Sequence, residues 1–153
     1  MLELFGDYNL FDLPQEGEAV CVTTNGMIKK DGHAVMGAGI AKEANQRFAI
    51  SKKLAEYLDK YGNRAFNMGC YEDGSRKFNI LTLPTKNNWR DNSDIELICT
   101  SCQQLVQMCD KFGFNKVYLS RPGCTNGKLS WSLVKSRIEP ILDDRFVVVH
   151  NKP

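Results

Sequence analysis

Two short stretches of small residues have the composition of anion-binding loops. The first, MGAGI at residues 36–40, lies between a β-branched segment and a helix-like one. Its backbone amides and the unpaired N–H groups of the following helix would point to one spot, which the helix dipole makes positive and attractive to phosphate. The stretch is neither a Walker A loop nor a dinucleotide fingerprint, because Gly37-x-Gly39 lacks the third glycine. Close packing of helix on sheet is the alternative explanation, and glycine content alone favours neither.

The second stretch, RPGCTNGKLSW at residues 121–131, repeats this composition. Gly123, Asn126 and Gly127 tolerate positive φ, so the backbone there can curl its N–H groups around an anion before a helix that begins near Ser130. Two such loops side by side predict a site for a pyrophosphate that bridges them.

Between these stretches, LPTKNNWRDNSD places Lys86, Trp89 and Arg90 directly after an apolar run. Most lysines are simply solvated, but a lysine in a crevice lined by phosphate and ribose, beside other cations, is a candidate nucleophile. Trp89 either stacks on a base or sugar or packs against the helix that follows, and we favour packing. His33 has a side chain suited to acid–base work, but we favour a structural hydrogen bond.

The six cysteines are interpreted as reduced thiols, because most lie in or beside apolar runs and no secretion signal precedes them. Cys99 and Cys102 form a C-x-x-C within a helical pattern that lacks a second pair of zinc ligands. With only two histidines, far apart in the sequence, we expect no metal site and no cofactor.

Length and charge limit the class of protein. A chain of 153 residues without a linker or a repeat predicts one domain, residues 1–153. The 20 basic and 18 acidic residues are spread along the chain, which argues against nucleic-acid binding by bulk charge, although a local basic patch remains compatible with this composition. No apolar run approaches the ~20 residues of a membrane helix. We expect a cytoplasmic monomer without membrane partners.

The periodicity of apolar residues predicts the elements that position these loops. We expect strands over 18–26, 116–123 and 145–150. Two more strands are expected within 65–84, joined by a turn at Asp73-Gly74, and Pro84 would end the second of these two. Helices are expected over 40–48, 52–62, about 94–112 and 130–142, with Pro140 disturbing the last turn of the final one. Asp91, Ser93 or Asp94 would cap the third helix.

This alternation predicts an α/β protein: a three-layer α/β/α sandwich around a central mixed β-sheet, with the hairpin as its antiparallel part. Ligands of open α/β sheets bind beyond the carboxyl ends of the strands. The loops 25–41, 84–93 and 121–130 are expected at that edge.

Four segments, VCVTTNG, MGAGIAKEANQRF, LPTKNNWR and RPGCTNGKLSW, resemble in order and spacing the macrodomain family, which binds ADP-ribose. They look most similar to the branch of terminal ADP-ribose glycohydrolases and of antitoxin glycohydrolases that remove ADP-ribose from DNA bases. The resemblance extends over nearly the whole chain. The combination of the last three segments is fairly specific, whereas each alone is weak.

The resemblance implies roles for individual positions. Asp7, or Asp12 in a competing alignment, would meet the adenine amino group, and Asn25 would face the distal ribose. His150 and Asn151 would flank the adenine. The two loops would hold the pyrophosphate and the distal ribose through Met36, Gly37, Ala38, Gly39 and Ile40 on one side and Gly123, Cys124, Thr125, Asn126 and Gly127 on the other.

Lys86 matches the lysine that attacks the anomeric carbon in the terminal glycohydrolases. Those enzymes also use an aspartate at the position of Gly127, and the DNA-directed branch has an aspartate at the position of Ser130. The resemblance therefore implies an ADP-ribosyl hydrolase whose release step lacks its usual carboxylate. A phosphatase of ADP-ribose 1''-phosphate and a non-catalytic module that binds free or attached ADP-ribose are the alternatives.

Overall fold

A computed structural model describes residues 1–151. Its six strands form one mixed sheet in the order β1-β6-β5-β2-β4-β3, in which only β3 and β4 pair antiparallel. The strands are β1 (Leu2–Phe5), β2 (Ala19–Asn25), β3 (Phe66–Asp73), β4 (Arg76–Lys86), β5 (Val117–Ser120) and β6 (Phe146–His150). The predicted hairpin is thus the antiparallel part of the sheet.

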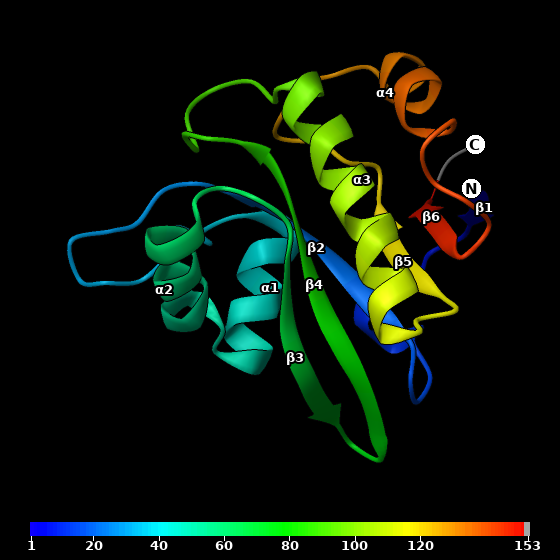
Figure 1. The fold of residues 1–153 in the computed structure, drawn as a ribbon, viewed down its shortest axis with the longest axis horizontal. Helices are drawn as coiled ribbons and strands as arrows, with labels where there is room; N and C mark the ends of the chain where they lie inside the picture. Colours follow the sequence, from blue (N-terminus) through cyan, green and yellow to red (C-terminus); the bar gives the residue numbers. More distant parts are fainter. Residues whose placement is uncertain (152–153) are drawn as a thin grey trace.

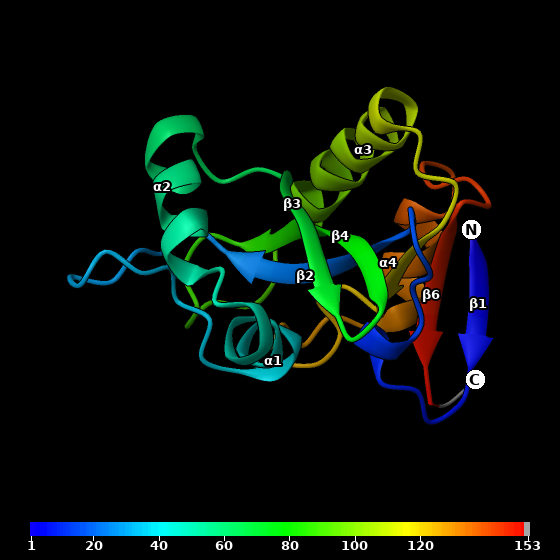
Figure 2. The ribbon, with the colours of Figure 1, turned by 90° about the horizontal axis from the view of Figure 1, so that it is seen from below.

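Helices cover both faces of this sheet (Figures 1 and 2). The helices are α1 (Gly39–Phe48), α2 (Ser51–Tyr61), α3 (Ile95–Phe112) and α4 (Trp131–Ile138), with a 3-10 turn η1 (Leu10–Asp12) near the amino end. In β2, Val20 and Val22 pack in one core with α1 and α2, whereas Cys21 packs in a second core with α3 and α4. This alternation confirms the predicted three-layer α/β/α architecture.

The third helix follows its sequence signals closely. The Asp94 carboxylate accepts hydrogen bonds from the backbone N–H groups of Glu96 (3.0 Å) and Leu97 (3.3 Å), so Asp94 is the cap among the three candidates. Gly113 ends the helix with a φ of 76°. Ser130 caps α4 in the same way through Leu133 N–H, at 3.3 Å.

Two expectations about strands are wrong. The first strand, β1, was not expected, because its four half-exposed residues are too few to show an alternating pattern. The strand β4 continues through Pro84 to Lys86 instead of ending at the proline. There β4 lies beyond the start of β3, which pairs opposite Thr82, so proline sits where β4 has a neighbour on one side only.

The fourth helix is shorter than expected: it ends at Ile138, two residues before Pro140, because proline has no backbone N–H with which to continue the helical hydrogen bonds. Over residues 1–151 no helix is long and apolar enough to cross a membrane. All six cysteines are free thiols, and Cys99 and Cys102 are buried.

Candidate functional site

A cleft of about 700 Å³ lies at the carboxyl ends of β2, β4 and β5. This volume is in the range of small-molecule sites. The structure brings eleven of the fifteen candidate residues together in its lining: Asn25, Met36, Gly37, Ala38, Gly39, Ile40, Lys86, Gly123, Thr125, Asn126 and Gly127. The three loops expected at this edge of the sheet therefore form one site.

The glycines of the first loop leave its backbone open to the cleft. A Cβ added at Gly37 would meet nothing within 4 Å, and one at Gly39 would meet only the Asn126 amide nitrogen, at 3.6 Å. Close packing therefore does not explain these two glycines. Gly39 is also the first residue of α1 and has a φ of 59°, while Ala38, the N-cap, supplies no side-chain hydrogen bond. The first N–H groups of α1 thus lack a side-chain cap where they border the cleft.

Asn25 holds the beginning of this first loop. Its side-chain nitrogen donates to the Val35 carbonyl at 3.1 Å, and its side-chain oxygen accepts from Met27 N–H at 3.0 Å. Asn25 therefore fixes the loop where it leaves β2.

The second glycine-rich loop is curled, and one of the three residues expected to take positive φ, Gly123, does so. Its left-handed residues are Gly123 (φ 76°) and Lys128 (φ 63°), and neither Asn126 nor Gly127 adopts positive φ. Asn126 lies across the cleft from Gly39. The two loops thus face each other as predicted, although the position of the turn is different.

Gly127 lies against Ser93, a cleft-lining residue that sequence reasoning missed. A Cβ at Gly127 would overlap the Ser93 hydroxyl oxygen and would lie 2.6 Å from the Gly123 carbonyl oxygen. Ser93 N–H donates to the Gly127 carbonyl at 3.0 Å, while its buried hydroxyl has no partner within residues 1–151. Ser93 therefore fills the space that a side chain at residue 127 would need.

Lys86, at the last position of β4, lines the same cleft. Its Nζ donates to the Asp91 carbonyl at 3.1 Å, which holds the half-buried side chain beside the cleft. Its own carbonyl accepts from the Asn63 side chain at 3.1 Å. Both the backbone and the amine of Lys86 are therefore positioned by neighbouring loops.

A smaller hollow of about 400 Å³ extends the cleft toward β1 and β6. Asp7 and Tyr8 line it, and it shares Ile40 and Ser120 with the cleft, so the two are neighbours. Asp12, the competing candidate, does not line the hollow. Its exposed carboxylate lies 3.9 Å from Arg47 instead.

Three candidates line neither cavity, namely Cys124, His150 and Asn151. His150 ends β6, and its carbonyl accepts from Gly6 N–H at 3.1 Å, next to Asp7. Asn151 is exposed. The Cys124 thiol donates to the Pro122 carbonyl at 3.4 Å, and burial raises its pKa, which disfavours a thiolate.

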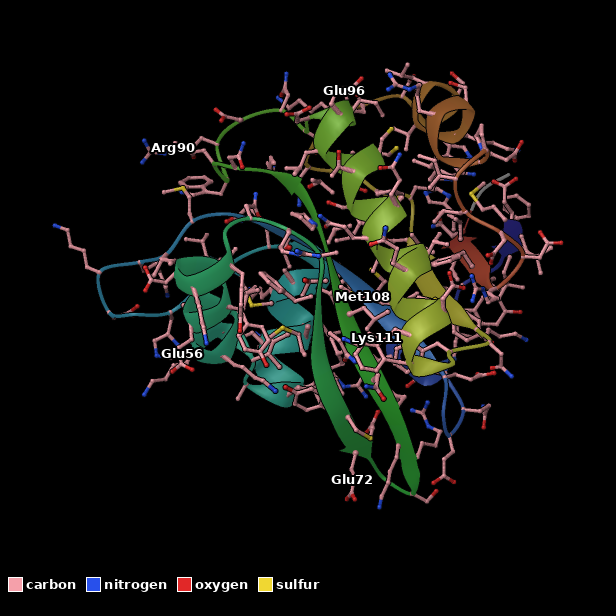
Figure 3. The ribbon with its side chains drawn as sticks, viewed as in Figure 1. Glu56, Glu72, Arg90, Glu96, Met108 and Lys111 are labelled. Carbon is pink, nitrogen blue, oxygen red and sulfur yellow. The ribbon has the colours of Figure 1, made fainter. Side chains whose placement is uncertain are left out.

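The structure decides the side-chain alternatives for His33 and Trp89. His33 Nδ1 lies 2.8 Å from the Ser51 hydroxyl, outside the cleft lining, so the structural hydrogen bond is confirmed. The packing expectation for Trp89 is wrong: this side chain is 48% exposed and lines the cleft, with the Arg90 guanidinium 5.0 Å from its ring centroid. Figure 3 shows Arg90 on the loop that joins β4 to α3.

Sequence reasoning also missed Ser120 and Arg121, which line the cleft where β5 ends. The Arg121 guanidinium lies 5.0 Å from the Trp131 ring centroid. Their position directly before the second glycine-rich loop was the available signal, because residues at the carboxyl end of a central strand face the ligand edge.

No family model matches the chain. A DNA ADP-ribosyl glycohydrolase of Thermus aquaticus is 27% identical over 140 residues, which cover 88% of this chain and 36% of that protein. A DNA ADP-ribosyl transferase–DNA ADP-ribosyl glycohydrolase fusion protein of Thermosipho africanus is 28% identical over 118 residues, or 65% of this chain and 30% of that protein. The chain thus matches about a third of the length of these curated relatives.

Solved structures of macrodomains are similar to this chain. The macrodomain of Thermus aquaticus DarG has a TM-score of 0.74 and 25% identity, with 99% of each chain covered. The macrodomain of Mycobacterium tuberculosis DarG has a TM-score of 0.72 and 25% identity, with 97% of each covered. Thermosipho africanus DarTG in complex with ADP-ribose has a TM-score of 0.67 and 21% identity, with 86% of this chain and 37% of that chain covered.

Proposed function

Because this chain has the macrodomain fold over nearly its whole length, we propose that it binds ADP-ribose in the 700 Å³ cleft and removes it from a modified nucleic acid. The observation that carries the proposal is the position of one amine, Lys86 Nζ, in a cleft that two facing glycine-rich loops enclose. The names of the curated relatives support DNA as the acceptor.

The pyrophosphate would lie between Gly37–Ile40 and Gly123–Gly127. The first loop offers backbone N–H groups at the positive end of α1, and these groups bind an anion without requiring a charged side chain. The adenine would then extend into the hollow lined by Asp7 and Tyr8, and the distal ribose would lie toward Asn25 and Lys86.

In the proposed reaction, Lys86 is the nucleophile. The Nζ lone pair forms a bond to the anomeric carbon, the bond from that carbon to the acceptor breaks, and the acceptor leaves with the electron pair and takes up a proton that the alkylated nitrogen loses. Water then attacks the same carbon, the carbon–nitrogen bond breaks, and the lysine leaves with that electron pair and takes up the proton that the water loses. The pyrophosphate, held nearby, stabilises positive charge that develops on the sugar.

The release of the lysine adduct proceeds without a protein carboxylate in this proposal. No aspartate or glutamate is among the described residues that line the cleft, and Ser93 excludes a side chain at residue 127. We therefore expect the second step to be the slower one, so that the sugar–lysine adduct accumulates. The same absence of a cleft carboxylate is what favours the second candidate function, binding of ADP-ribose without turnover.

The test is to incubate the protein with ADP-ribosylated single-stranded DNA, ADP-ribosylated protein and ADP-ribose 1''-phosphate, and to follow release of ADP-ribose. Release from the DNA supports the proposal. Binding of ADP-ribose with no turnover of any of the three would leave the binding module, and turnover of the 1''-phosphate alone would make the protein a phosphatase. Light scattering after gel filtration tests the accompanying expectation of a monomer.

A further inference from the structure

A separate groove of about 550 Å³ lies at the edge of the sheet between α2 and α3, over the start of β3. We call it the edge groove. Figures 1 and 2 show α2 and α3 on either side of β3, and Figure 3 shows Met108 and Lys111 on the second half of α3. Its lining combines the aromatic side chains Tyr57, Tyr61, Phe66 and Phe112 with the cations Arg64 and Lys111.

Two of the four aromatic rings of the edge groove, Tyr61 and Phe112, are exposed to solvent. Tyr61 is 56% exposed and Phe112 is 50% exposed, one on each wall. The Tyr61 ring contacts two neighbouring rings: its centroid lies 6.1 Å from that of Tyr57 and 6.2 Å from that of Phe66. Exposed rings that line a groove are available for stacking on a partner.

Each exposed ring has a cation beside it. Lys60 Nζ lies 5.2 Å from the Tyr61 ring centroid, and Lys111 Nζ lies 5.3 Å from that of Phe112. No acidic residue is among the described residues that line the groove. Proteins that bind single-stranded nucleic acids combine aromatic rings, on which bases stack, with cations that pair with the phosphates. The edge groove has both.

The edge groove is joined to the cleft through one short segment. Asn63 donates from its side-chain nitrogen to the Lys86 carbonyl (3.1 Å) and to the Asn87 side-chain oxygen (2.9 Å), and the next residue, Arg64, lines the groove. Gln104 ties the groove floor to α3 by accepting from Ala65 N–H at 2.9 Å. The cleft residue Lys86 and the groove residue Arg64 are therefore linked through Asn63.

We propose that the edge groove binds the single-stranded nucleic acid that carries the ADP-ribose, with bases stacked on Tyr61 and Phe112 and phosphates paired with Lys60, Arg64 and Lys111. The identity of the strand as a substrate rests on the proposed function, whereas its binding to the groove does not. The groove explains how a chain with a net charge of only +2 would hold nucleic acid, because the cations are concentrated at one place.

The direct test uses fluorescence anisotropy with an unmodified, labelled single-stranded oligonucleotide of about 10 nucleotides. Three cations that each neutralise one phosphate give an expected slope of about −2 for log affinity against log salt concentration. Tyr61→Ala and Phe112→Ala should each weaken binding about tenfold, since each removes one stacking ring, and Lys111→Glu should weaken binding and flatten the slope.

Two control variants distinguish the effect of the groove from the effect of changing charge or exposed apolar surface elsewhere. Lys52→Glu makes the same charge change on α2, where Lys52 is about 180° around the helix from Tyr61. Leu133→Ala truncates a comparably exposed apolar side chain on α4. Both controls should bind the oligonucleotide like the wild type, and all five variants should keep the wild-type affinity for ADP-ribose.

A second measurement links the groove to turnover. With ADP-ribosylated oligonucleotide, the groove variants should raise KM and leave kcat unchanged. Oligonucleotide binding that is absent in the wild type, or equal in wild type and groove variants, would overturn the inference while leaving ADP-ribose hydrolysis intact. Groove variants that lose turnover of ADP-ribosylated protein, but not of DNA, would overturn it in favour of a polypeptide partner.

Discussion

Replacing Gly127 by aspartate should fail to restore the carboxylate that the terminal glycohydrolases carry there, because the site has no room for it. The Cβ of any side chain at this position would overlap the Ser93 hydroxyl and lie 2.6 Å from the Gly123 carbonyl oxygen and 2.7 Å from Ser93 Cβ. Distances below 3.0 Å force neighbouring atoms to move. Two of the three obstacles belong to Ser93, but the third is backbone, so shortening Ser93 alone does not clear the space.

The size of the effect follows from overpacking and from the buried charge. Inserting one carbon into a packed site costs about 1–3 kcal/mol, and a carboxylate next to a carbonyl oxygen adds to this. For a chain of this length, each kcal/mol lowers the melting temperature by roughly 2–4 °C. We therefore expect Gly127→Ala to melt about 2–12 °C below the wild type, and Gly127→Asp to melt lower still without faster turnover.

The assay is thermal unfolding beside ADP-ribose release from modified DNA. Gly37→Ala is the matched control, since Gly37 lies in the facing loop with nothing within 4 Å of an added Cβ, and it should melt like the wild type. If Gly127→Asp melts with the wild type and accelerates release, then Ser93 does not occupy this space and the reasoning is refuted.

Three further predictions concern binding, catalysis and acid stability. Lys86→Ala should reduce ADP-ribose release at least 100-fold while calorimetry shows nearly unchanged ADP-ribose affinity, because the amine reacts but does not hold the phosphates; persistent turnover would remove Lys86 from the mechanism. Gly39→Glu should abolish ADP-ribose binding, since the side chain would enter the cleft from a residue with a φ of 59° and bring negative charge to the anion site; unchanged affinity in calorimetry would contradict this. The Glu3 carboxylate accepts hydrogen bonds from Lys135 (2.8 Å) and Trp131 (3.1 Å), and the Lys135 contact above all lowers the pKa of Glu3. A lowered folded-state pKa contributes stability above the unfolded value that is lost as the pH falls through the folded value. The melting temperature of the wild type should therefore drop more steeply than that of Glu3→Gln below pH 4.5, and parallel curves would show that the pair does not stabilise the fold.

The sequence predicted those parts of the fold that depend on long, regular patterns. The helix α3 has apolar residues at regular spacing, a capping aspartate and a terminal glycine, and all three signals agree with the structure. β1 has no such pattern, because a four-residue edge strand is specified by its pairing with β6 and not by its own residues. The prediction that Pro84 ends a strand was wrong for a related reason. Whether a proline ends a strand depends on whether another strand pairs with it on each side, and β3 does not reach Pro84.

The site was predictable where backbone chemistry defines it and less so where side chains meet from distant segments. Residue type and position placed Gly37 and Gly39 at the ligand edge of the sheet, and the structure then decided between an open and a packed backbone. The contact between Ser93 and Gly127 joins two loops far apart in the sequence, so no local pattern reports it. Lys128 takes the left-handed conformation that residue type assigns to Asn126 and Gly127, because packing of the loop decides where the turn falls.

The irregular end of β4 affects the direction of the Lys86 side chain, the proposed nucleophile. The pairing between β2 and β4 shifts after Thr24, which pairs with Pro84, so that Asn25 pairs with Lys86. Thr85 is the residue without a partner in β2 at this shift, and it is buried, while both Thr85 and Lys86 line the cleft. Because a one-residue change of register moves the side chains that follow to the other face of a sheet, we expect deletion or duplication of a single residue between Pro84 and Lys86 to turn the Lys86 amine away from the position proposed for the sugar. For the proposed reaction, the number of residues in this segment therefore matters as much as the presence of the lysine.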